Sequence, residues 1–600
     1  MTTDAHDANP SSPQLLWADD GSPRSGRFGD VYFSKDDGLA ETRAVFLGGC
    51  DMPAVWQGRR HFTVGELGFG TGLNIIALID LWRAHRPDQG HLHVFTVEGY
   101  PLTREEAAKA LAAWPDVADT AAALLDQWPD NRPGFHRIDL PQWGVTIDLA
   151  IGEVEWALAA WSGKADAWFL DGFSPALNPG MWSEDIMAAV TRLSAPGCHL
   201  ATFTVAGAVR RALAANGFTV EKRPGHGRKR ERLEARLPAD PAVQPPSPRS
   251  IAVIGGGIAG ASVVRALKAI GLLPVLIERS APGAGASGFP ASLVTPRLDA
   301  GDAFIGGLYA QCLDRAGQLY NRIDKAILQH GVVQLEQAER DAVRYDKIAA
   351  QPLWPDTTMQ RLSAAEASDL LGEKVDCGGL YMKGAFALSP ATALSAWLAD
   401  TPIVTAEVTA LQAENGQWSV LDRDGQTIAT ADAVVVAAGW GTAELLPQLN
   451  LAPVAGQADW VNDGSHHLPA AWGGYSIPTG HGLLYGATHV RGETDPQPSS
   501  DASDHNLQTL QSRLPMRADE AAKHTPQSRV AVRATTSDRL PVCGPVDENL
   551  YVLSGMGSRG FCASPLLAEH LAALITGTTS PLPVQWADRL SPARLHARRG

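Results

Sequence analysis

The residues best placed for chemistry lie in two glycine-rich loops, each predicted between a buried strand and a helix. The first loop reads ELGFGTG over residues 66–72, and the second reads GGGIAG over residues 255–260. Glycine lets a backbone turn tightly and approach a ligand closely. Only the second loop has the G-x-G-x-x-G spacing that places a pyrophosphate at the N-terminus of a helix. The two loops therefore predict two different cofactor sites in one chain.

The first loop has the pattern of a methyl-donor site. Its candidate binding residues are Glu66, Gly68, Gly70 and Gly72, and the next predicted strand ends in Glu98. The pattern resembles the first motif of class I S-adenosylmethionine-dependent methyltransferases. This resemblance implies that Glu98 binds the ribose hydroxyls of the donor. A structural turn also uses glycine, but an acidic residue at this distance favours the methyltransferase.

Two more acidic residues follow predicted strands farther along the chain. Glu153 follows the segment TIDLAIG, where it can lie beside the adenine amine of the donor, and Asp171 follows an apolar strand, residues 167–170. Ligands bind at the carboxyl ends of strands in open α/β sheets, so Asp171 should project toward the donor. A carboxylate there can orient an amine and take its proton, as methyl transfer to nitrogen requires. The alternative is an aspartate that caps a helix.

Three further segments point to one family. They are VYFSKDDGLAETRAVFL (31–47), DGFSPALNPGMW (171–182) and GHGRKRERL (225–233). Together they resemble the N-terminal domain of the MnmC family of bifunctional tRNA-modifying proteins, over nearly all of residues 15–237. That family makes 5-methylaminomethyl-2-thiouridine at the wobble position of certain tRNAs. The resemblance therefore implies that tRNA is a partner.

A concentrated basic stretch agrees with a polyanionic partner. Residues 210–236 hold nine basic and three acidic side chains, although the whole chain has a net charge of −15. The resemblance places the tail 225–232 where tRNA is expected, with Lys229 and Arg230 as RNA-binding residues. The alternative for such a charge run is a solvated helix face or edge strand.

The second glycine loop opens a complete dinucleotide-binding unit. A predicted strand precedes Gly255, Gly257 and Gly260, a helix follows, and the next strand ends in Glu278. Every element of the βαβ fingerprint is present in order. The loop alone leaves both NAD and FAD open as the cofactor.

Later segments decide between these cofactors in favour of FAD. They occur in the order of D-amino-acid-oxidase-like flavoproteins, a group that includes glycine and sarcosine oxidases, and the resemblance spans residues 250–577. It implies a second set of FAD-binding residues, namely Ser287, Gly439, Gly557, Ser558 and Gly560.

The same resemblance indicates how the oxidase would hold its substrate. In glycine-oxidase-like proteins, arginines that match Arg533 and Arg559 bind the substrate carboxylate, and the planar guanidinium suits this pairing. We expect Arg539 to form a structural ion pair or an RNA contact. Gln457 follows Ala-Gly where an Arg-Gly-Gln sequence is expected, so any role of that arginine is in doubt here.

The elements that must position these residues divide at a proline-rich linker. Residues 238–249 carry five prolines and no apolar periodicity, as expected of a semi-stiff connection. We predict an α/β protein with a class I, Rossmann-like methyltransferase domain over residues 1–237. We predict an FAD-binding βαβ fold with an inserted α+β substrate domain over residues 250–600.

Composition limits the remaining classes. No stretch approaches the ~20 apolar residues of a membrane span, and the six cysteines form no C-x-x-C pair, which argues against a zinc site or a disulfide framework. We expect a cytoplasmic monomer with no metal and no membrane partner.

These features support one leading hypothesis and two alternatives. The leading hypothesis is an enzyme that oxidatively removes the carboxymethyl group from 5-carboxymethylaminomethyl-(2-thio)uridine of tRNA and then methylates the exposed amine. The first alternative is a fused amine oxidase and N-methyltransferase that acts on free amino acids. The second is an RNA-binding protein whose cofactor folds are vestigial.

Overall fold

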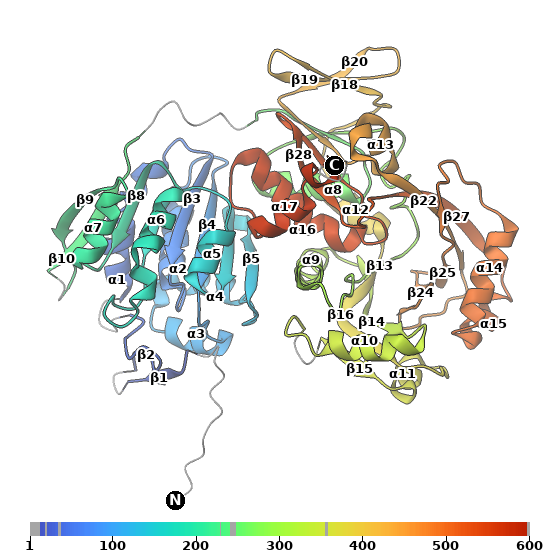
Figure 1. Ribbon diagram of the computed structural model, residues 1–600, viewed down its shortest axis with the longest axis horizontal. Coiled ribbons are helices and arrows are strands. Elements are labelled where there is room, and N and C mark those ends of the chain that lie inside the picture. Colours follow the sequence, from blue (N-terminus) through green and yellow to red (C-terminus); the bar gives the residue numbers. More distant parts are fainter. Residues whose placement is uncertain are drawn as a thin grey trace, which may run out of the picture. The chain divides into compact units, whose positions relative to one another are not determined.

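The computed structural model describes residues 13–18, 21–33, 38–227, 230–239, 248–354 and 358–596. The chain divides into two compact units (Figure 1). The first unit is Met1–Ser247 with Ala269–Gly271 and Thr576–Gln585, and the second is Pro248–Lys268, Leu272–Ile575 and Trp586–Gly600. The domain boundaries proposed at residues 237 and 250 stay a prediction.

The first unit is built on an eight-stranded sheet with the order β5-β6-β4-β3-β7-β8-β10-β9. The five strands β6, β4, β3, β7 and β8 are parallel, whereas β5 and β10 run antiparallel to their neighbours. The chain moves outward from β3 on one side and from β7 on the other, so the switch point of the sheet lies between β3 and β7. The strands are β3 (His61–Leu67), β4 (His91–Glu98), β5 (Gly134–Leu140), β6 (Val145–Ile151), β7 (Ala165–Leu170), β8 (Ser194–Thr202), β9 (Thr219–Pro224) and β10 (Glu231–Arg236).

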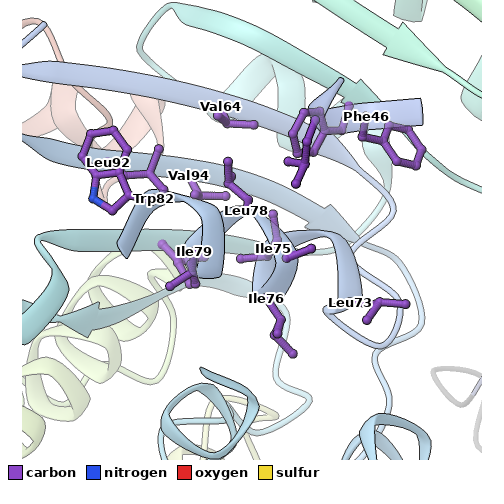
Figure 2. Packing of buried hydrophobic residues seen from close by; sticks show 14 of the residues in the cluster. Phe46, Val64, Leu73, Ile75, Ile76, Leu78, Ile79, Trp82, Leu92 and Val94 are labelled. Carbon is purple, nitrogen blue, oxygen red and sulfur yellow. The ribbon is translucent and has the colours of Figure 1, made fainter. Parts of the chain in front are cut away.

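Helices pack apolar side chains against this sheet in two clusters. Helix α2 places apolar residues at 75, 78, 79 and 82, the spacing of one helical face. Figure 2 shows Ile75, Leu78 and Trp82 of this helix beside Val64 and Val94 of the sheet. The helices of the unit are α1 (Gly38–Thr42), α2 (Leu73–His85), α3 (Arg104–Leu111), α4 (Ala118–Leu125), α5 (Val154–Ala160), α6 (Glu184–Arg192) and α7 (Gly207–Ala215), and a small hairpin precedes them, β1 (Leu15–Trp17) and β2 (Pro23–Ser25).

The second unit contains a six-stranded sheet with the order β17-β12-β11-β21-β29-β28, in which only β28 is antiparallel to its neighbour. Helix α8 connects β11 to the adjacent parallel strand β12, which is the predicted βαβ unit. The elements are β11 (Ile251–Ile254), α8 (Ile258–Ala269), β12 (Val275–Glu278), β17 (Ile403–Thr405), β21 (Ala433–Val436), β28 (Val542–Asp547), β29 (Leu550–Ser554) and α16 (Gly560–Thr576).

A mixed ten-stranded sheet with its own helices is inserted between these strands, so the predicted fold class is confirmed. Residues between β12 and β17 and between β21 and β28 supply it. A three-stranded sheet follows β17, with β18 (Ala410–Glu414), β19 (Gln417–Leu421) and β20 (Thr427–Ala431). The strands of the inserted sheet are β13 (Ser292–Val294), β14 (Ile327–Leu335), β15 (Met359–Leu362), β16 (Gly379–Leu388), β22 (Ala452–Val461), β23 (Ala470–Ala471), β24 (Tyr475–Pro478), β25 (Leu483–Gly486), β26 (Val490–Arg491) and β27 (Gln527–Thr535), and its main helices are α9 (Ala303–Tyr320), α10 (Glu339–Ala349), α11 (Ala364–Leu371), α14 (Ser500–Gln511) and α15 (Pro515–Ala521).

Candidate functional sites

A cavity of about 580 Å³ lies at the switch point of the first sheet. Gly68 and Gly70 follow β3, and Asp171 follows β7, the strand next to it. Glu98, at the end of β4, and Glu153, after β6, complete the part of the wall that the sequence predicted. Four separate segments therefore bring their predicted residues to one cavity.

Close backbone packing explains the first two glycines of the loop. Gly68 has a φ of +94°, and a methyl group added there would lie 2.3 Å from the carbonyl oxygen of Asp171. Gly70 has a φ of +54°, and its added methyl group would lie 3.2 Å from the ring of Tyr32. Side chains at these positions would fill the cradle beside the cavity. The third glycine, Gly72, caps α2 and lies against Leu124 and Phe69. It is not among the residues that line the cavity, so its contact with the donor stays a prediction.

The Glu98 carboxylate is fixed by the backbone of the same cavity. Its Oε2 accepts a hydrogen bond from the Gly70 N–H at 2.8 Å, and its Oε1 accepts one from the Tyr100 N–H at 2.8 Å. Burial raises the pKa of Glu98, and these backbone hydrogen bonds oppose the shift. Each carboxylate oxygen has a second lone pair, so this geometry leaves acceptor capacity for a ribose hydroxyl.

Glu66 is the predicted donor-binding residue that the structure places elsewhere. It is fully buried on β3 and does not line the cavity. Its carboxyl group accepts hydrogen bonds from Thr96 at 2.6 Å and from Asn74 at 3.1 Å. Glu66 therefore lies beneath the cavity and supports its wall, which corrects the prediction of direct contact with the donor.

Asp171 stands where the sequence predicted a proton acceptor. It lines the cavity, and the residues that follow it form turns, so it is not a helix cap. Its Oδ1 accepts a hydrogen bond from the Gly172 N–H at 3.0 Å, and its Oδ2 accepts one from Asn74 Nδ2 at 2.7 Å. The carboxylate is therefore held at both oxygens in the cavity wall.

An aromatic wall of the cavity was not predicted from the sequence. Phe28 stacks on Phe173 at a centroid distance of 4.8 Å, and Tyr32 meets Phe173 edge-on at 5.3 Å. Asp30 Oδ2 accepts a hydrogen bond from the Ser174 N–H at 3.1 Å. The segment 21–33 thus closes one side of the cavity against the loop that follows β7.

In the second unit, the predicted FAD loops meet at the carboxyl ends of neighbouring strands. Gly255 follows β11 with a φ of +105°, and an added methyl group would lie 2.6 Å from the Ala437 carbonyl oxygen. Gly439 follows β21, and Gly560 begins α16 after β29, with its added methyl group 3.2 Å from Ile258. Since β11, β21 and β29 are adjacent, these glycines form one cradle.

The acidic residue and the serine of this unit brace the same loop. Glu278 Oε2 accepts a hydrogen bond from the Gly256 N–H at 2.6 Å. Ser287 Oγ accepts one from the Ile258 N–H at 3.0 Å and lies 3.3 Å from a methyl group placed at Gly257. The open backbone at Gly257 suits the close approach of a pyrophosphate to the N-terminus of α8.

Gly260→Ala is expected to strip the protein of FAD. The added methyl group would lie 1.8 Å from the Gly255 carbonyl oxygen, so the loop and the start of α8 must separate. We expect the FAD content of purified protein, measured by visible absorption, to fall about tenfold or more, which corresponds to ~1.4 kcal/mol of binding free energy.

The control for this variant is Gly317→Ala in α9, where an added methyl group meets no atom within 4 Å. It should bind FAD normally. Full FAD content in the Gly260 variant would show that this turn does not hold the cofactor.

The two predicted carboxylate-binding arginines lie on segments that pair with each other. Arg533 is on β27, and Arg559 follows β29. The Gly557 N–H donates to the Ala534 carbonyl at 3.0 Å, and an isolated bridge joins Thr535 to Met556. Gly557 and the exposed Ser558 lie between β29 and α16, directly before Arg559 and beside the end of β27.

Both guanidinium groups lack a hydrogen-bonding or ion-pairing partner within the described part of the chain. Burial lowers the pKa of Arg533 and of Arg559. A methyl group at Gly456 would lie 2.7 Å from Arg533 Nη2, so glycine makes room for the guanidinium. Cations withdrawn from water without a counterion are costly, and these two half-buried guanidinium groups suit an anionic ligand.

Two other positions on these strands have roles that the sequence did not settle. The Gln457 amide donates to Asp459 at 3.2 Å and to Ser503 at 2.9 Å, which ties β22 to α14. Arg539 is exposed, and the described part of the chain shows no ion pair for it, so the RNA contact is the alternative that remains for this residue.

Comparisons with known proteins match both halves of the chain. A model described as FAD dependent oxidoreductase matches residues 250–574, and one described as S-adenosyl-L-methionine-dependent methyltransferase matches residues 115–238. A tRNA 5-methylaminomethyl-2-thiouridine biosynthesis bifunctional protein MnmC from Caulobacter sp. (strain K31) is 51% identical, over 98% of this chain and 99% of that protein. The chain belongs to the MnmC family. Relatives of the same name from Caulobacter vibrioides and Maricaulis maris are 50% and 40% identical, over 98% and 100% of this chain and 98% of each relative.

Membership in the MnmC family settles the two cofactors. The protein is a bifunctional enzyme, with an S-adenosylmethionine-dependent methyltransferase domain and an FAD-dependent oxidoreductase domain. The glycine cradles in the two units fit these groups, because added side chains would collide with backbone or ring atoms there.

In this MnmC family member, part of the positive charge of the basic stretch is paired with acidic side chains. Lys222 pairs with Glu231 at 2.7 Å, Arg223 with Glu221 at 2.7 Å, and Arg232 with Glu234 at 2.7 Å. Lys229 lies outside the described residues. Among the described ones, Arg210, Arg211 and Arg230 remain exposed and form no ion pair.

The described ranges contain neither a membrane span nor a metal site. No helix there has the length and apolar character needed to cross a membrane. Within the same ranges, no cluster of three or more His, Cys, Asp or Glu is arranged to hold a metal ion.

Proposed function

We propose that this chain performs two consecutive steps on the wobble uridine of tRNA. The FAD-dependent domain removes the carboxymethyl group of 5-carboxymethylaminomethyl-(2-thio)uridine, giving 5-aminomethyl-(2-thio)uridine. The methyltransferase domain then methylates the exposed amine, giving 5-methylaminomethyl-(2-thio)uridine. The observation that carries the proposal is full-length similarity to MnmC proteins, combined with a separate cofactor site in each unit.

The oxidase half requires recognition of a carboxylate attached to an amine. FAD supplies the oxidation of the carbon–nitrogen bond when it is bound. Arg533 and Arg559 hold the carboxylate of the carboxymethylamino group, since both side chains are half-buried and their guanidinium groups lack a partner among the described residues. A planar guanidinium pairs both carboxylate oxygens at once, which fixes the orientation of the adjacent carbon.

The methyltransferase half requires an amine with a free lone pair. A primary amine is mostly protonated near neutral pH, so its proton must leave before nitrogen attacks the methyl group. Asp171, which lines the cavity and is anchored at both oxygens, receives that proton. S-adenosylmethionine, when bound in this cavity, would supply the methyl group, and Asp171 would leave the amine nitrogen with the free lone pair that accepts it.

The direct test is a reaction of purified, FAD-loaded protein with tRNA that carries 5-carboxymethylaminomethyluridine. Without S-adenosylmethionine, the aminomethyl nucleoside should accumulate with release of glyoxylate. Addition of S-adenosylmethionine should convert it to the methylaminomethyl nucleoside. Turnover of free glycine or sarcosine in place of tRNA would favour the alternative, in which the substrates are free amino acids.

Arg230→Ala is expected to weaken the use of tRNA. This exposed side chain has no ion-pair partner among the described residues, so loss of its charge should remove a phosphate contact. We expect the KM for tRNA to rise about 3–10-fold. The slope of the logarithm of the binding constant against the logarithm of the salt concentration should become shallower by about one, because one phosphate contact is lost. The readout is methylation of tRNA across a salt series.

Lys222→Ala is the matched control, because its ammonium group is already paired with Glu231. It should leave the salt dependence unchanged. Unaltered tRNA kinetics in the Arg230 variant would count against a tRNA contact at this hairpin.

We further propose that the enzyme acts in the cytoplasm as a monomer. All six cysteines are free thiols, and five of them are buried, which suits a reducing compartment. Size-exclusion chromatography with light scattering measures the oligomeric state.

A further inference from the structure

One amide side chain joins two carboxyl groups beneath the methyltransferase cavity. Asn74, near the start of α2, lies with its Nδ2 3.1 Å from Glu66 Oε1 and 2.7 Å from Asp171 Oδ2. Its Oδ1 accepts a hydrogen bond from Thr42 Oγ1 at 2.8 Å. Both amide hydrogens and the carbonyl oxygen are therefore used, on a side chain that is only 7% exposed.

The orientation of this amide follows from its partners. An Asn amide has two donors on nitrogen and an acceptor on oxygen, and a carboxylate is an acceptor alone. A flipped amide would set its carbonyl oxygen against Asp171 and Glu66 and its nitrogen against Thr42. The hydrogen-bonding network therefore defines which atom faces the catalytic carboxylate.

Glu66 anchors this amide from within the core. It is completely buried, and its second oxygen accepts a hydrogen bond from Thr96 at 2.6 Å. Burial raises the pKa of Glu66 to about 8. The charges of Asp171 and Glu98 also raise this pKa, and hydrogen bonds from Thr96 and Asn74 lower it.

We propose that Asn74 is a positioning residue for the methyl transfer, because its amide holds the Asp171 carboxylate in the orientation that receives the proton of the substrate amine. The torsion that rotates a carboxylate is soft, and the Gly172 N–H reaches only the Oδ1 atom of Asp171. The Asn74 contact fixes the second oxygen and so the carboxylate plane. This inference rests on the proposed methyl transfer and adds to it a residue on α2.

The first test is Asn74→Asp, which keeps the shape of the side chain and replaces the donor with an acceptor. An oxygen of the new carboxylate would then stand where Asn74 Nδ2 now lies, 2.7 Å from Asp171 Oδ2. Two carboxylates this close share a proton. We expect kcat for methylation to fall about 100-fold or more, with the KM for tRNA and the Kd for S-adenosylmethionine within about threefold of wild type. Asn216→Asp at the end of α7, whose side chain bonds one backbone carbonyl, is the control and should methylate normally.

The second test separates positioning from stability. The double variant combines Asn74→Asp with Glu66→Gln. Its glutamine amide can donate to the carboxylate at position 74, so the buried contact between positions 66 and 74 again has one donor and one acceptor. Asp171 still lacks the hydrogen bond from the Asn74 amide. We expect the melting temperature to recover while kcat remains about 100-fold low, and glyoxylate release by the second unit should be normal in every variant.

Either of two results would overturn the inference. One is a kcat of Asn74→Asp within about threefold of wild type, and the other is recovery of kcat together with stability in the double variant. Failure of the proposed function itself is recognised separately, because wild-type protein would then not methylate the tRNA at all.

Discussion

Asp171→Ala is expected to lower the rate of tRNA methylation by about 10³-fold while glyoxylate release continues at the wild-type rate. A positioned general base contributes roughly 10²–10⁴-fold to a rate, and Asp171 lines the cavity with both oxygens anchored. Its loss leaves the substrate amine without an acceptor for its proton. The measurement is nucleoside analysis after reaction, in which 5-aminomethyluridine should accumulate as an end product.

Asp116→Ala is a suitable control for this variant. Asp116 is an exposed aspartate of the same unit and lies outside the cavity, so both activities should be normal. Equal loss of methylation and glyoxylate release in the Asp171 variant would mean that the change acts through the fold, and the assignment of a proton acceptor would then be wrong.

Arg533→Ala should chiefly raise the KM of the oxidase for its carboxymethylamino substrate. Removal of one partner from a buried, hydrogen-bonded charge pair costs about 2–3 kcal/mol, which corresponds to a rise of roughly 30–150-fold. The kcat should change much less, because Arg559 still binds the carboxylate in the complex. Arg533→Lys keeps the charge but loses the planar fork, so we expect an intermediate KM.

Arg340→Ala on the exposed face of α10 tests for a general effect of lost charge in the same unit. It should leave the KM unchanged. If the KM of the Arg533 variant matched that of wild type, Arg533 would be removed from the carboxylate site.

The parts of the sites that the sequence predicted are those set by local chain geometry. A strand, a glycine turn and a helix form one continuous signal, so the sequence located both cofactor loops. The ends of parallel strands converge at one edge of a sheet, which is why Glu98, Glu153 and Asp171 could be assigned to a common cavity before the structure was known.

The aromatic wall could not be predicted, because it depends on contacts between distant segments. Phe28 and Asp30 reach Phe173 and Ser174 across more than 140 residues of chain. The segment 21–33 forms little regular structure and has no apolar period that would place it against β7. Its position follows from tertiary packing alone.

The pairing of side chains explains two further findings that the sequence could not predict, namely the offset positive charge of the basic stretch and the buried position of Glu66. The antiparallel register of β9 and β10 sets Lys222 opposite Leu233 and diagonal to Glu231, so part of the counted positive charge is offset. Glu66 follows the motif of a donor-binding acid, yet its side chain points into the core toward Thr96. Pattern alone does not distinguish a buried carboxyl group from one that faces a ligand.

Nucleoside mass spectrometry of tRNA from cells that lack this protein tests the central claim most directly. Loss of both sites should leave 5-carboxymethylaminomethyl-(2-thio)uridine at the wobble position, with the methylaminomethyl nucleoside absent. A normal level of the methylaminomethyl nucleoside in those cells, with no build-up of the carboxymethylaminomethyl form, would contradict the account.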